Sequence, residues 1–503
     1  MIVEALGLLF NIESFLYMNI GLFLGMVFGA IPGLTVLLSI VIFLPFTYAL
    51  PPIPSFMFLL GMYCAGSYGG SISAVLIGTP GTPHATATML DGYPMSMKGQ
   101  GRKALHVALT ASTFGGLFSA VVLLLFAPQV AALADNLGSP DYFLICLLGL
   151  TIIAGVSGKS LKKGIISGLI GLFISLIGLD PMTGTTRYIF GNINLYSGFD
   201  ITICLIGLFA LSEALKKGGE GNSGFKTCLK ADESWKLKRE DYRKIALPSF
   251  LSALIGVVVG IIPGTGASEA SFFSYNNARN ISKHPEEFGK GSIEGIAAAE
   301  TANNAVTGAT LIPLLTLGIP GDACVAVLLG ALMINNLTPG PTLFLDHGAT
   351  VYAILIGMIF INIFMYVQGR FLTSVFARVV RVPMQILTPL IVVFCFAGSF
   401  CVNSSIADVF IAVFFSLASY VLLKLEYPVV PVLLGLVLGD TMEENFRRSL
   451  ILSGGSPKIF FESLSSLVLI FILTVVVALI IREKYYSERR VRHGEKFKAE
   501  DCT

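Results

Sequence analysis

The sequence predicts an all-α membrane protein with about eleven or twelve transmembrane helices, built as two inverted repeats that contain re-entrant or broken helical hairpins. The first of three observations is composition: the 503 residues are 54% hydrophobic and only 13% charged, with a mean hydropathy of +0.80. The second is that the apolar runs are continuous, as in helices of about 20 residues, and do not alternate as in a β-barrel. The third is that Gly and Pro interrupt several of these runs.

The apolar segments form two groups along the chain. The first group lies near residues 15–31, 34–50, 54–78, 105–127, 141–157, 164–180 and 199–215, and the second near 246–262, 292–317, 322–338, 349–368, 384–402, 405–423, 428–440 and 459–481. Several segments are too short or too broken to cross a bilayer fully. We expect a first inverted repeat at 1–215, a cytoplasmic linker at 216–244, a second inverted repeat at 245–450, a last transmembrane helix at 451–481 and a basic cytoplasmic tail at 482–503.

Composition and motifs exclude several function classes. The net charge of +2 gives no electrostatic basis for binding nucleic acid. The eight Cys show no CxxC spacing, and most lie in apolar runs, where a small buried side chain is the default interpretation. The chain has no HExxH or GxSxG motif, and "GVSGKS" at 155–160 is too short for a phosphate-binding loop. We therefore do not expect an enzyme.

A repeated motif relates the two groups of segments. "GMVFGAIPGLT" at 25–35 and "GVVVGIIPGTG" at 256–266 both have the pattern GxxxGxxPG. Each is followed by a second Pro-Gly break, "GTPGTP" at 78–83 and "GIPGDA" at 318–323. An internal duplication explains this order.

Basic residues indicate the orientation of the halves, because cytoplasmic loops collect Lys and Arg. Residues 98–103, which follow the second break of the first half, carry three basic residues, whereas the equivalent 338–348 carry none. The pattern reverses before the break, where 47–55 is uncharged and 278–291 carries three. The halves are therefore predicted to be inverted, as in secondary transporters, with the N-terminus outside and the C-terminus in the cytoplasm.

Pro-Gly breaks free backbone groups that lipid cannot satisfy, so the breaks must be sheltered. The helix N-termini at a break suit carboxylates, and its carbonyl groups suit Na⁺. The predicted substrate-binding residues are Gly33, Thr35, Thr79, Gly81, Thr82, Gly264, Thr265, Ser268, Asn303, Asn304, Gly318 and Gly321. The predicted ion-coupling residues are Thr316, Glu300 and Asp322; the last two are ionisable groups within apolar segments.

Other interpretations of these residues remain open at this point. Gly25, Gly29, Gly256 and Gly260 have the spacing of close helix packing, which we favour for them over a binding role. Glu300 is equally explained as a helix-end carboxylate near water, and His84 as a loop residue or a proton carrier.

Four stretches carry a resemblance to a known family. They are "YGGSISAVLIGTPGTPHATATMLDGYPM", "SKHPEEFGKGSIEGIAAAETANNA", "PLLTLGIPGDACVAVLLGALMINNLTPGP" and "GDTMEENFRRSLILSGG". At these stretches, and over nearly its whole length, the sequence resembles the large membrane subunit of the tripartite tricarboxylate transporters, the TctA family of bacterial permeases. The family pattern includes residues 78–83 and 318–321, Asn303 and Asn304. Three residues depart from the family pattern. We expect a small or neutral residue in place of Asp322, a non-acidic residue in place of Glu269, and Pro in place of Ala299.

The resemblance implies a multi-pass permease of the cell inner membrane that imports a carboxylate, a tricarboxylate such as citrate or a related organic acid. It implies cation symport with Na⁺ or H⁺ and no other cofactor. The implied partners are a small membrane subunit (TctB-like), a periplasmic solute-binding protein (TctC-like) and the lipid bilayer, and a homodimer is left open. The hairpins favour elevator-like alternating access; the alternative is a passive anion channel or uniporter.

Overall fold

The computed structural model describes residues 1–156, 160–218, 237–379 and 384–500. Residues 219–236, most of the predicted linker, lie outside the described residues, as do 501–503 at the end of the predicted tail. Within the described part, eight helices are long and apolar enough to cross a membrane, and shorter apolar helices lie at Val36–Ala49, Ser139–Gly155 and Ala323–Ile334. The prediction of an all-α, multi-span membrane protein is confirmed.

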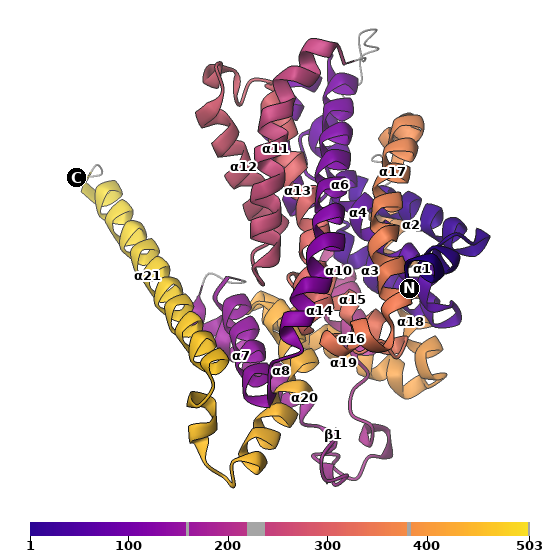
Figure 1. Ribbon diagram of the computed structural model, residues 1–503. Coiled ribbons are helices and arrows are strands. Elements are labelled where there is room, and N and C mark those ends of the chain that lie inside the picture. The colour runs from indigo at the N-terminus through magenta and orange to yellow at the C-terminus, as the bar shows by residue number, and fades with distance from the viewer. Residues whose placement is uncertain (157–159, 219–236, 380–383, 501–503) are drawn as a thin grey trace. The chain divides into compact units, whose positions relative to one another are not determined.

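The chain forms two compact units (Figure 1). Unit 1 comprises Met1–Asp135 and Thr202–Tyr420, and unit 2 comprises Asn136–Ile201 and Val421–Thr503. The helices that lie wholly or largely in unit 1 are α1 (Ile2–Leu9), α2 (Ile12–Ala30), α3 (Val36–Phe43), α4 (Pro52–Ile77), α5 (Thr86–Met97), α6 (Gly101–Ala134), α9 (Ile201–Leu205), α10 (Ser212–Gly218), α11 (Arg239–Ile261), α12 (Ala267–Ile281), α13 (Ile293–Ala309), α14 (Leu311–Leu317), α15 (Ala323–Ile334), α16 (Pro341–Asp346), α17 (Gly348–Val379), α18 (Met384–Asn403) and α19 (Ile406–Lys424). Unit 2 contains α7 (Ser139–Val156), α8 (Leu161–Ser175), β1 (Gly178–Leu179), β2 (Thr186–Arg187), α20 (Val429–Leu452) and α21 (Leu464–Glu500).

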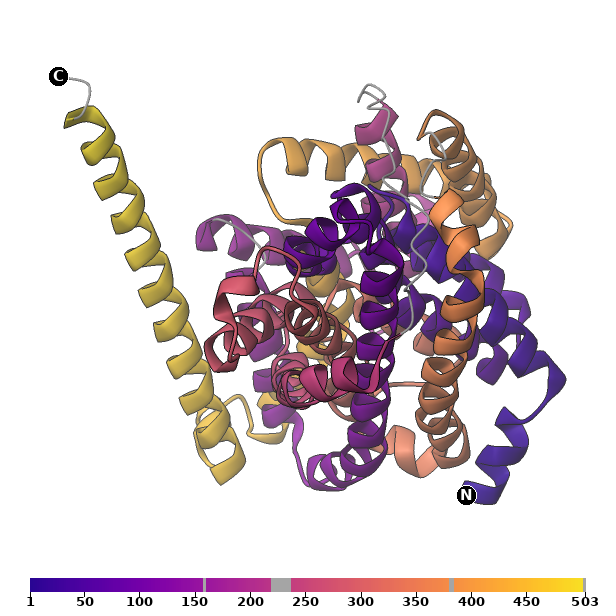
Figure 2. The same cartoon turned by 90° about the horizontal axis from the view of Figure 1, so that it is seen from above.

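Helix α4 forms the core of unit 1. Of its most apolar window, 94% is buried, and the helix packs on α2, α5, α6, α13 and α17. Figures 1 and 2 show α6, α11 and α13 running side by side next to it. A helix that is apolar on every side is stable only when other helices or lipid surround it, so α4 is enclosed on all faces.

Glycines bring the helices of each half into close contact. A Cβ atom at Gly25 on α2 would lie 2.5 Å from the carbonyl oxygen of Met62 on α4. A Cβ atom at Gly256 on α11 would lie 2.7 Å from the carbonyl oxygen of Ala302 on α13. The predicted packing role of the GxxxG motifs is therefore confirmed in both halves.

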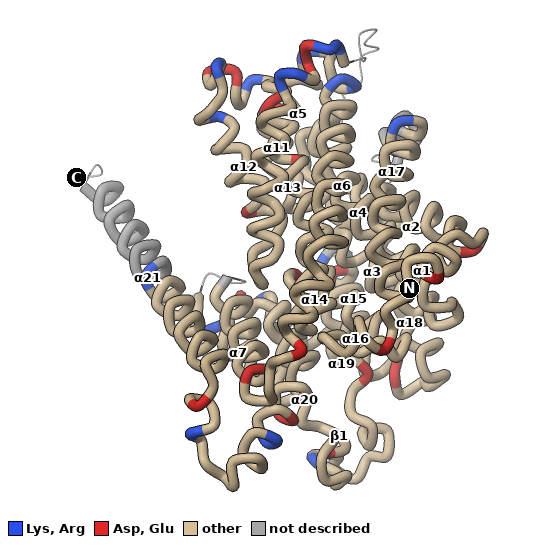
Figure 3. The backbone as a smooth tube through the Cα atoms, in the orientation of Figure 1, with Lys and Arg blue, Asp and Glu red and all other residues tan. Residues whose placement is uncertain are grey.

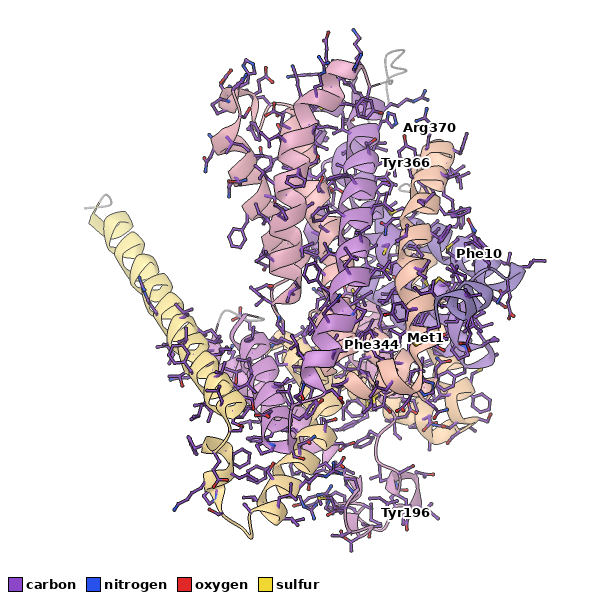
Figure 4. All side chains as sticks on the ribbon, in the orientation of Figure 1. Met1, Phe10, Tyr196, Phe344, Tyr366 and Arg370 are labelled. Atoms are coloured by element: carbon purple, nitrogen blue, oxygen red, sulfur yellow. The ribbon has the colours of Figure 1, made fainter. Side chains whose placement is uncertain are left out.

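Charged residues gather at one end of unit 1, around α5, the start of α11 and the end of α12 (Figure 3). There Lys98 Nζ donates to the carbonyl oxygen of Lys290 at 2.7 Å, and Lys103 pairs with Asp241 at 3.0 Å. Arg370 on α17 donates to Tyr366 at 3.0 Å (Figure 4). The loop after α5, which follows the second break of the first half, thus meets the loop between α12 and α13, which precedes the second break of the second half. Oppositely oriented halves require these two loops to lie on the same side. The inverted repeat itself stays a prediction.

Helices α4 and α13 pack antiparallel. Asn303 Nδ2 donates to the Ser67 carbonyl, and Cys64 Sγ donates to the Thr307 hydroxyl. The Tyr63 hydroxyl contacts that of Thr310, which directly follows α13. From one contact to the next, the residue number on α4 falls while the residue number of its partner rises. The two helices therefore run antiparallel. Each helix leads toward the second Pro-Gly break of its half, α13 by way of α14.

In unit 2, ion pairs join the β1–β2 hairpin to α20. Arg187 donates to Glu443 at 2.6 Å, and Arg447 donates to Asp180 at 2.7 Å and to Glu443 at 3.0 Å. The Arg447 guanidinium holds the pKa of the Asp180 carboxyl well below its ordinary value. Glu443 pairs with Arg447, and Glu444 pairs with Arg448, each one helical turn apart.

The substitution Gly25→Ala tests the close packing of α2 on α4. The new methyl group meets the Met62 carbonyl, so we expect a loss of about 1–3 kcal/mol of stability, measured as a lower thermal unfolding midpoint in detergent. The matched control is Gly7→Ala in α1, where a Cβ atom has no neighbour within 4 Å. Equal midpoints for the two variants would contradict the packing role.

Candidate functional site

The breaks have matching backbone conformations in the two halves. At the first break, Gly33 and Gly264 have φ of 90° and 84°. At the second, Gly78 ends α4 with φ of 68°, and Gly318 ends α14 with φ of 73°. Residues with a Cβ atom rarely adopt these positive values, which explains glycine at each position. The similarity of the motifs therefore extends to the geometry of the chain.

The two breaks within each half lie together. In the second half, the Gly264 N–H donates to the Gly321 carbonyl at 2.8 Å. In the first half, the Gly81 N–H donates to Gly70 at 3.2 Å, and the space for a Cβ atom at Gly81 is filled by the carbonyl group of Gly29, next to the first break. In the second half, a backbone group freed by one break is thus satisfied by backbone of the other, and in the first half by backbone of α4.

Residues of the first half also lie near the breaks of the second half. Tyr63 on α4 donates its hydroxyl to Asp322 Oδ2 at 2.7 Å. His84, in the short 3₁₀ helix Pro83–Ala85 after the second break of the first half, interacts electrostatically with Asp322 and Glu269. This 3₁₀ helix packs on α12 and α13. The structure therefore places the 3₁₀ helix Pro83–Ala85 beside α12, which begins directly after the first break of the second half.

Two acids that depart from the family pattern cap helices. Asp322 Oδ1 accepts from the Val325 N–H at 2.8 Å at the start of α15. Glu269 Oε2 accepts from the Gly266 N–H at 3.1 Å at the start of α12. A carboxylate at a helix N-terminus is stabilised by the helix dipole as well as by the hydrogen bond. Ala299 is fully buried within α13, where Pro would remove a helical hydrogen bond.

Several buried polar atoms have no hydrogen-bond partner among the described residues, and Thr82 Oγ1, Asn303 Oδ1 and Asn304 Oδ1 are among them. Thr82 is 2% exposed and both Asn residues are 0% exposed. A buried polar group without a partner costs about 1–3 kcal/mol, and most such groups in proteins are satisfied. These atoms therefore mark the place where a polar ligand would compensate the cost.

Glu300 is a carboxyl buried in the middle of α13, with 0% exposure. Thr88 on α5 donates to its Oε1 at 2.5 Å, and Ser112 on α6 donates to its Oε2 at 2.8 Å. The interpretation as a helix-end carboxylate near water is therefore wrong. A carboxyl in this setting is a functional candidate by default.

Other predicted residues have local roles. Thr35 Oγ1 caps α3 by accepting from Leu38 at 3.1 Å. The hydroxyl groups of Thr265 and Thr316 donate to carbonyl groups of their own segments, Val259 at 2.5 Å and Ile312 at 2.7 Å. Thr79 and Ser268 are partly exposed beside their breaks. Their binding and coupling roles stay predictions.

Asp91 on α5 is a site residue that the sequence interpretation missed. It is 0% exposed, and it accepts from the N–H groups of Gly291 and Ser292 at 2.8 and 2.9 Å and from the Tyr275 hydroxyl at 2.9 Å. It thus joins α5 to α12 and to the start of α13. The rule that selected Glu300, an acid within an apolar stretch, could have found it.

Within the described ranges, no group of three or more His, Cys, Asp or Glu residues could hold a metal ion. The polar atoms at the breaks and around Glu300 are hydroxyl, amide and carboxyl oxygens. Such oxygens suit a carboxylate ligand through their donors and a hard cation through their lone pairs.

Comparison with known proteins gives consistent matches. The sequence model described as "Tripartite tricarboxylate transporter TctA family" matches residues 15–434, which include every predicted site residue. An Agrobacterium vitis protein described as "Uncharacterized 52.8 kDa protein in TAR-I ttuC' 3'region" is 34% identical over 469 residues, 92% of this chain and 93% of that protein. Another, described as "Uncharacterized protein in TAR-II ttuC' 3'region", is 36% identical over 233 residues, 46% of this chain and 96% of that protein. No solved structure gives a significant match.

The role of Asp322 can be tested by comparing Asp322→Asn with Asp322→Ala. Asn is as good an N-cap as Asp, because its oxygen can accept from the Val325 N–H, and its amide nitrogen can donate to the Tyr63 hydroxyl in place of the present bond. We therefore expect Asn to keep the thermal unfolding midpoint. Ala removes the acceptor and should cost about 1 kcal/mol. If Asn lowers the midpoint as much as Ala, the charge itself is required and the capping role is insufficient.

Proposed function

Because the chain belongs to the tripartite tricarboxylate transporter TctA family, we propose that it is the permease subunit of a binding-protein-dependent secondary transporter. The family is a transporter family, so the chain is a component of a tricarboxylate transport system and not an enzyme. The proposed reaction is import of a carboxylate, such as citrate or a related organic acid, by symport with Na⁺ or H⁺. The proposed location is the cell inner membrane, with the N-terminus outside and the C-terminus in the cytoplasm.

The observation that carries the proposal is a set of buried, unpaired polar atoms on neighbouring segments. Thr82 Oγ1 lies at the second break of the first half, and Asn303 and Asn304 Oδ1 lie on α13, which packs on the 3₁₀ helix that follows this break. The Thr82 hydroxyl can donate to a carboxylate and so lower its own desolvation cost. The unpaired oxygens of Asn303 and Asn304 are acceptors, which suit a hydroxyl group of the solute or a cation, because the Nδ2 groups of these residues already donate to backbone carbonyls. A solute that fills this place is bound by groups that otherwise have no partner.

The charges of the breaks differ between the halves and support symport. The breaks of the second half carry the acids Glu269 and Asp322, and Glu300 lies on the helix that precedes one of them. The breaks of the first half carry no acid and include His84. An anion is therefore favoured next to the first half and a cation next to the second.

Elevator-like alternating access is the proposed mechanism, because all four breaks belong to unit 1. A compact block that contains the complete site can carry its solute as it moves. The proposed partners are the small membrane subunit and the periplasmic solute-binding protein that the family implies. The alternative is a passive anion channel or uniporter, which would need no cation site.

The first test is uptake of radioactive citrate into proteoliposomes that contain the chain with both partner proteins. We expect saturable uptake that an inward Na⁺ or H⁺ gradient accelerates, because a symporter couples the two fluxes. Dicarboxylates and aromatic acids as competitors would define the substrate class. Uptake at the same rate without any ion gradient would rule out symport and favour the alternative.

The second test is the substitution Thr82→Val. It keeps the side-chain volume and removes a hydroxyl with no partner, so stability should be kept. If that hydroxyl binds the carboxylate, uptake should fall about tenfold, because a hydrogen bond to a charged group contributes about 1.5–3 kcal/mol. The control is Thr110→Val on α6, whose hydroxyl donates to the His106 carbonyl at 2.8 Å. Normal uptake by Thr82→Val would exclude Thr82 from the site.

A further inference from the structure

Helices from both halves converge on the carboxyl group of Glu300. Thr88 and Ser112 donate to its two oxygens from α5 and α6. Ser71 on α4 and Asn303 on α13 also approach this carboxyl group. All five residues are fully buried, with 0% exposure. The site is therefore built from four helices and has no access to bulk water.

The charge of Glu300 has no compensating cation among the described residues. Its neighbours are hydroxyl and amide groups, and Tyr68, a neutral phenol, also interacts with it. A buried carboxylate without a counter-charge costs several kcal/mol, and hydrogen bonds from neutral side chains repay only part of this. The group must be neutralised, either by a proton or by a bound cation.

The oxygens around the carboxyl group distinguish these two cases. Ser71 Oγ and Asn303 Oδ1 are buried and have no hydrogen-bond partner among the described residues, although both side chains approach Glu300. Asn304 Oδ1 is equally unpaired. A proton on Glu300 could donate to only one of these oxygens. A hard cation takes several oxygen ligands at once.

We propose that Glu300, Ser71 and Asn303 bind a Na⁺ ion within unit 1, with Thr88 and Ser112 orienting the carboxylate. The proposal rests on the proposed symport and names the site of its coupling ion. The proposal assigns the ion to Glu300 and not to Asp322, because the two carboxylate oxygens of Asp322 already accept from Val325 and Tyr63. Asp322 therefore has a structural role, and the ion binds at the fully buried Glu300 within α13.

The position of the site explains how an ion would influence the solute. Asn304 lies one turn after Glu300, with its Nδ2 at 3.3 Å from the Glu300 carbonyl. Thr82 lies directly against Gly70, the neighbour of Ser71. An ion that orders Ser71 and Asn303 thus orders the residues proposed to bind the carboxylate. Coupling of this kind is reciprocal, so the carboxylate must also raise the affinity for Na⁺.

The test is equilibrium binding of radioactive Na⁺ to the purified full chain in detergent, with choline replacing Na⁺ at constant ionic strength and no organic acid. We expect saturable binding by the wild type. Glu300→Gln should abolish it, whereas Glu294→Gln, at the partly exposed start of the same helix, should not. Ser71→Ala should weaken it about threefold to tenfold. Its control is Ser55→Ala, because Ser55 is also a buried, unpaired serine on α4.

Each outcome has one meaning. Na⁺ binding that survives Glu300→Gln, or no Na⁺ binding by a wild type whose stability follows pH alone, would overturn the site. Because this assay needs neither substrate nor partners, it is independent of the uptake experiments. Na⁺-driven uptake without Na⁺ binding at Glu300 would leave the proposed function standing, and Na⁺ binding at Glu300 without carboxylate uptake would overturn only the function.

Discussion

The structure depends on one constraint: in hydrocarbon, a backbone group that loses its helical partner has no water to replace it. Every Pro-Gly break therefore needs a substitute partner. The chain supplies backbone at some positions, as between Gly264 and Gly321, and capping side chains at others, as at Thr35 and Asp322. Breaks can be supported in this way only where they face one another, which is why residues far apart in sequence converge here.

Close approach is the second requirement, and glycine provides it. The glycines of α2 and α11 let these helices lie directly on α4 and α13, so each first break stands beside the second break of its half. A larger side chain at Gly25 or Gly256 would separate the helices and remove the backbone partners of the loops. The GxxxG motifs and the Pro-Gly loops are thus parts of one arrangement, although only the loops carry the polar groups.

The sequence predicted the fold class, the repeated motif and the place of the breaks, because hydropathy, Gly and Pro act locally and leave a direct trace. It also predicted that Glu300 is unusual. It did not predict the partners of Glu300, since Thr88 and Ser112 are ordinary hydroxyl residues whose importance comes only from α5, α6 and α13 packing together. The hydrogen bonds through which Asp91 joins α5 to the start of α13 were missed for the same reason, as was the capping role of Asp322. Contacts between distant helices have no local signature.

The placement of the acids makes the electrostatics of the two halves different. A carboxylate entering a low-dielectric core is opposed by any fixed negative charge, and Glu269, Asp322 and Glu300 all belong to the second half. Helix dipoles and capping bonds compensate the first two. Glu300 lies within its helix, away from such compensation, so its charge must be neutralised by a group that is not part of the chain. If that group is a cation, entry of the anion becomes favourable only after the cation has bound, and an order of binding follows from electrostatics alone.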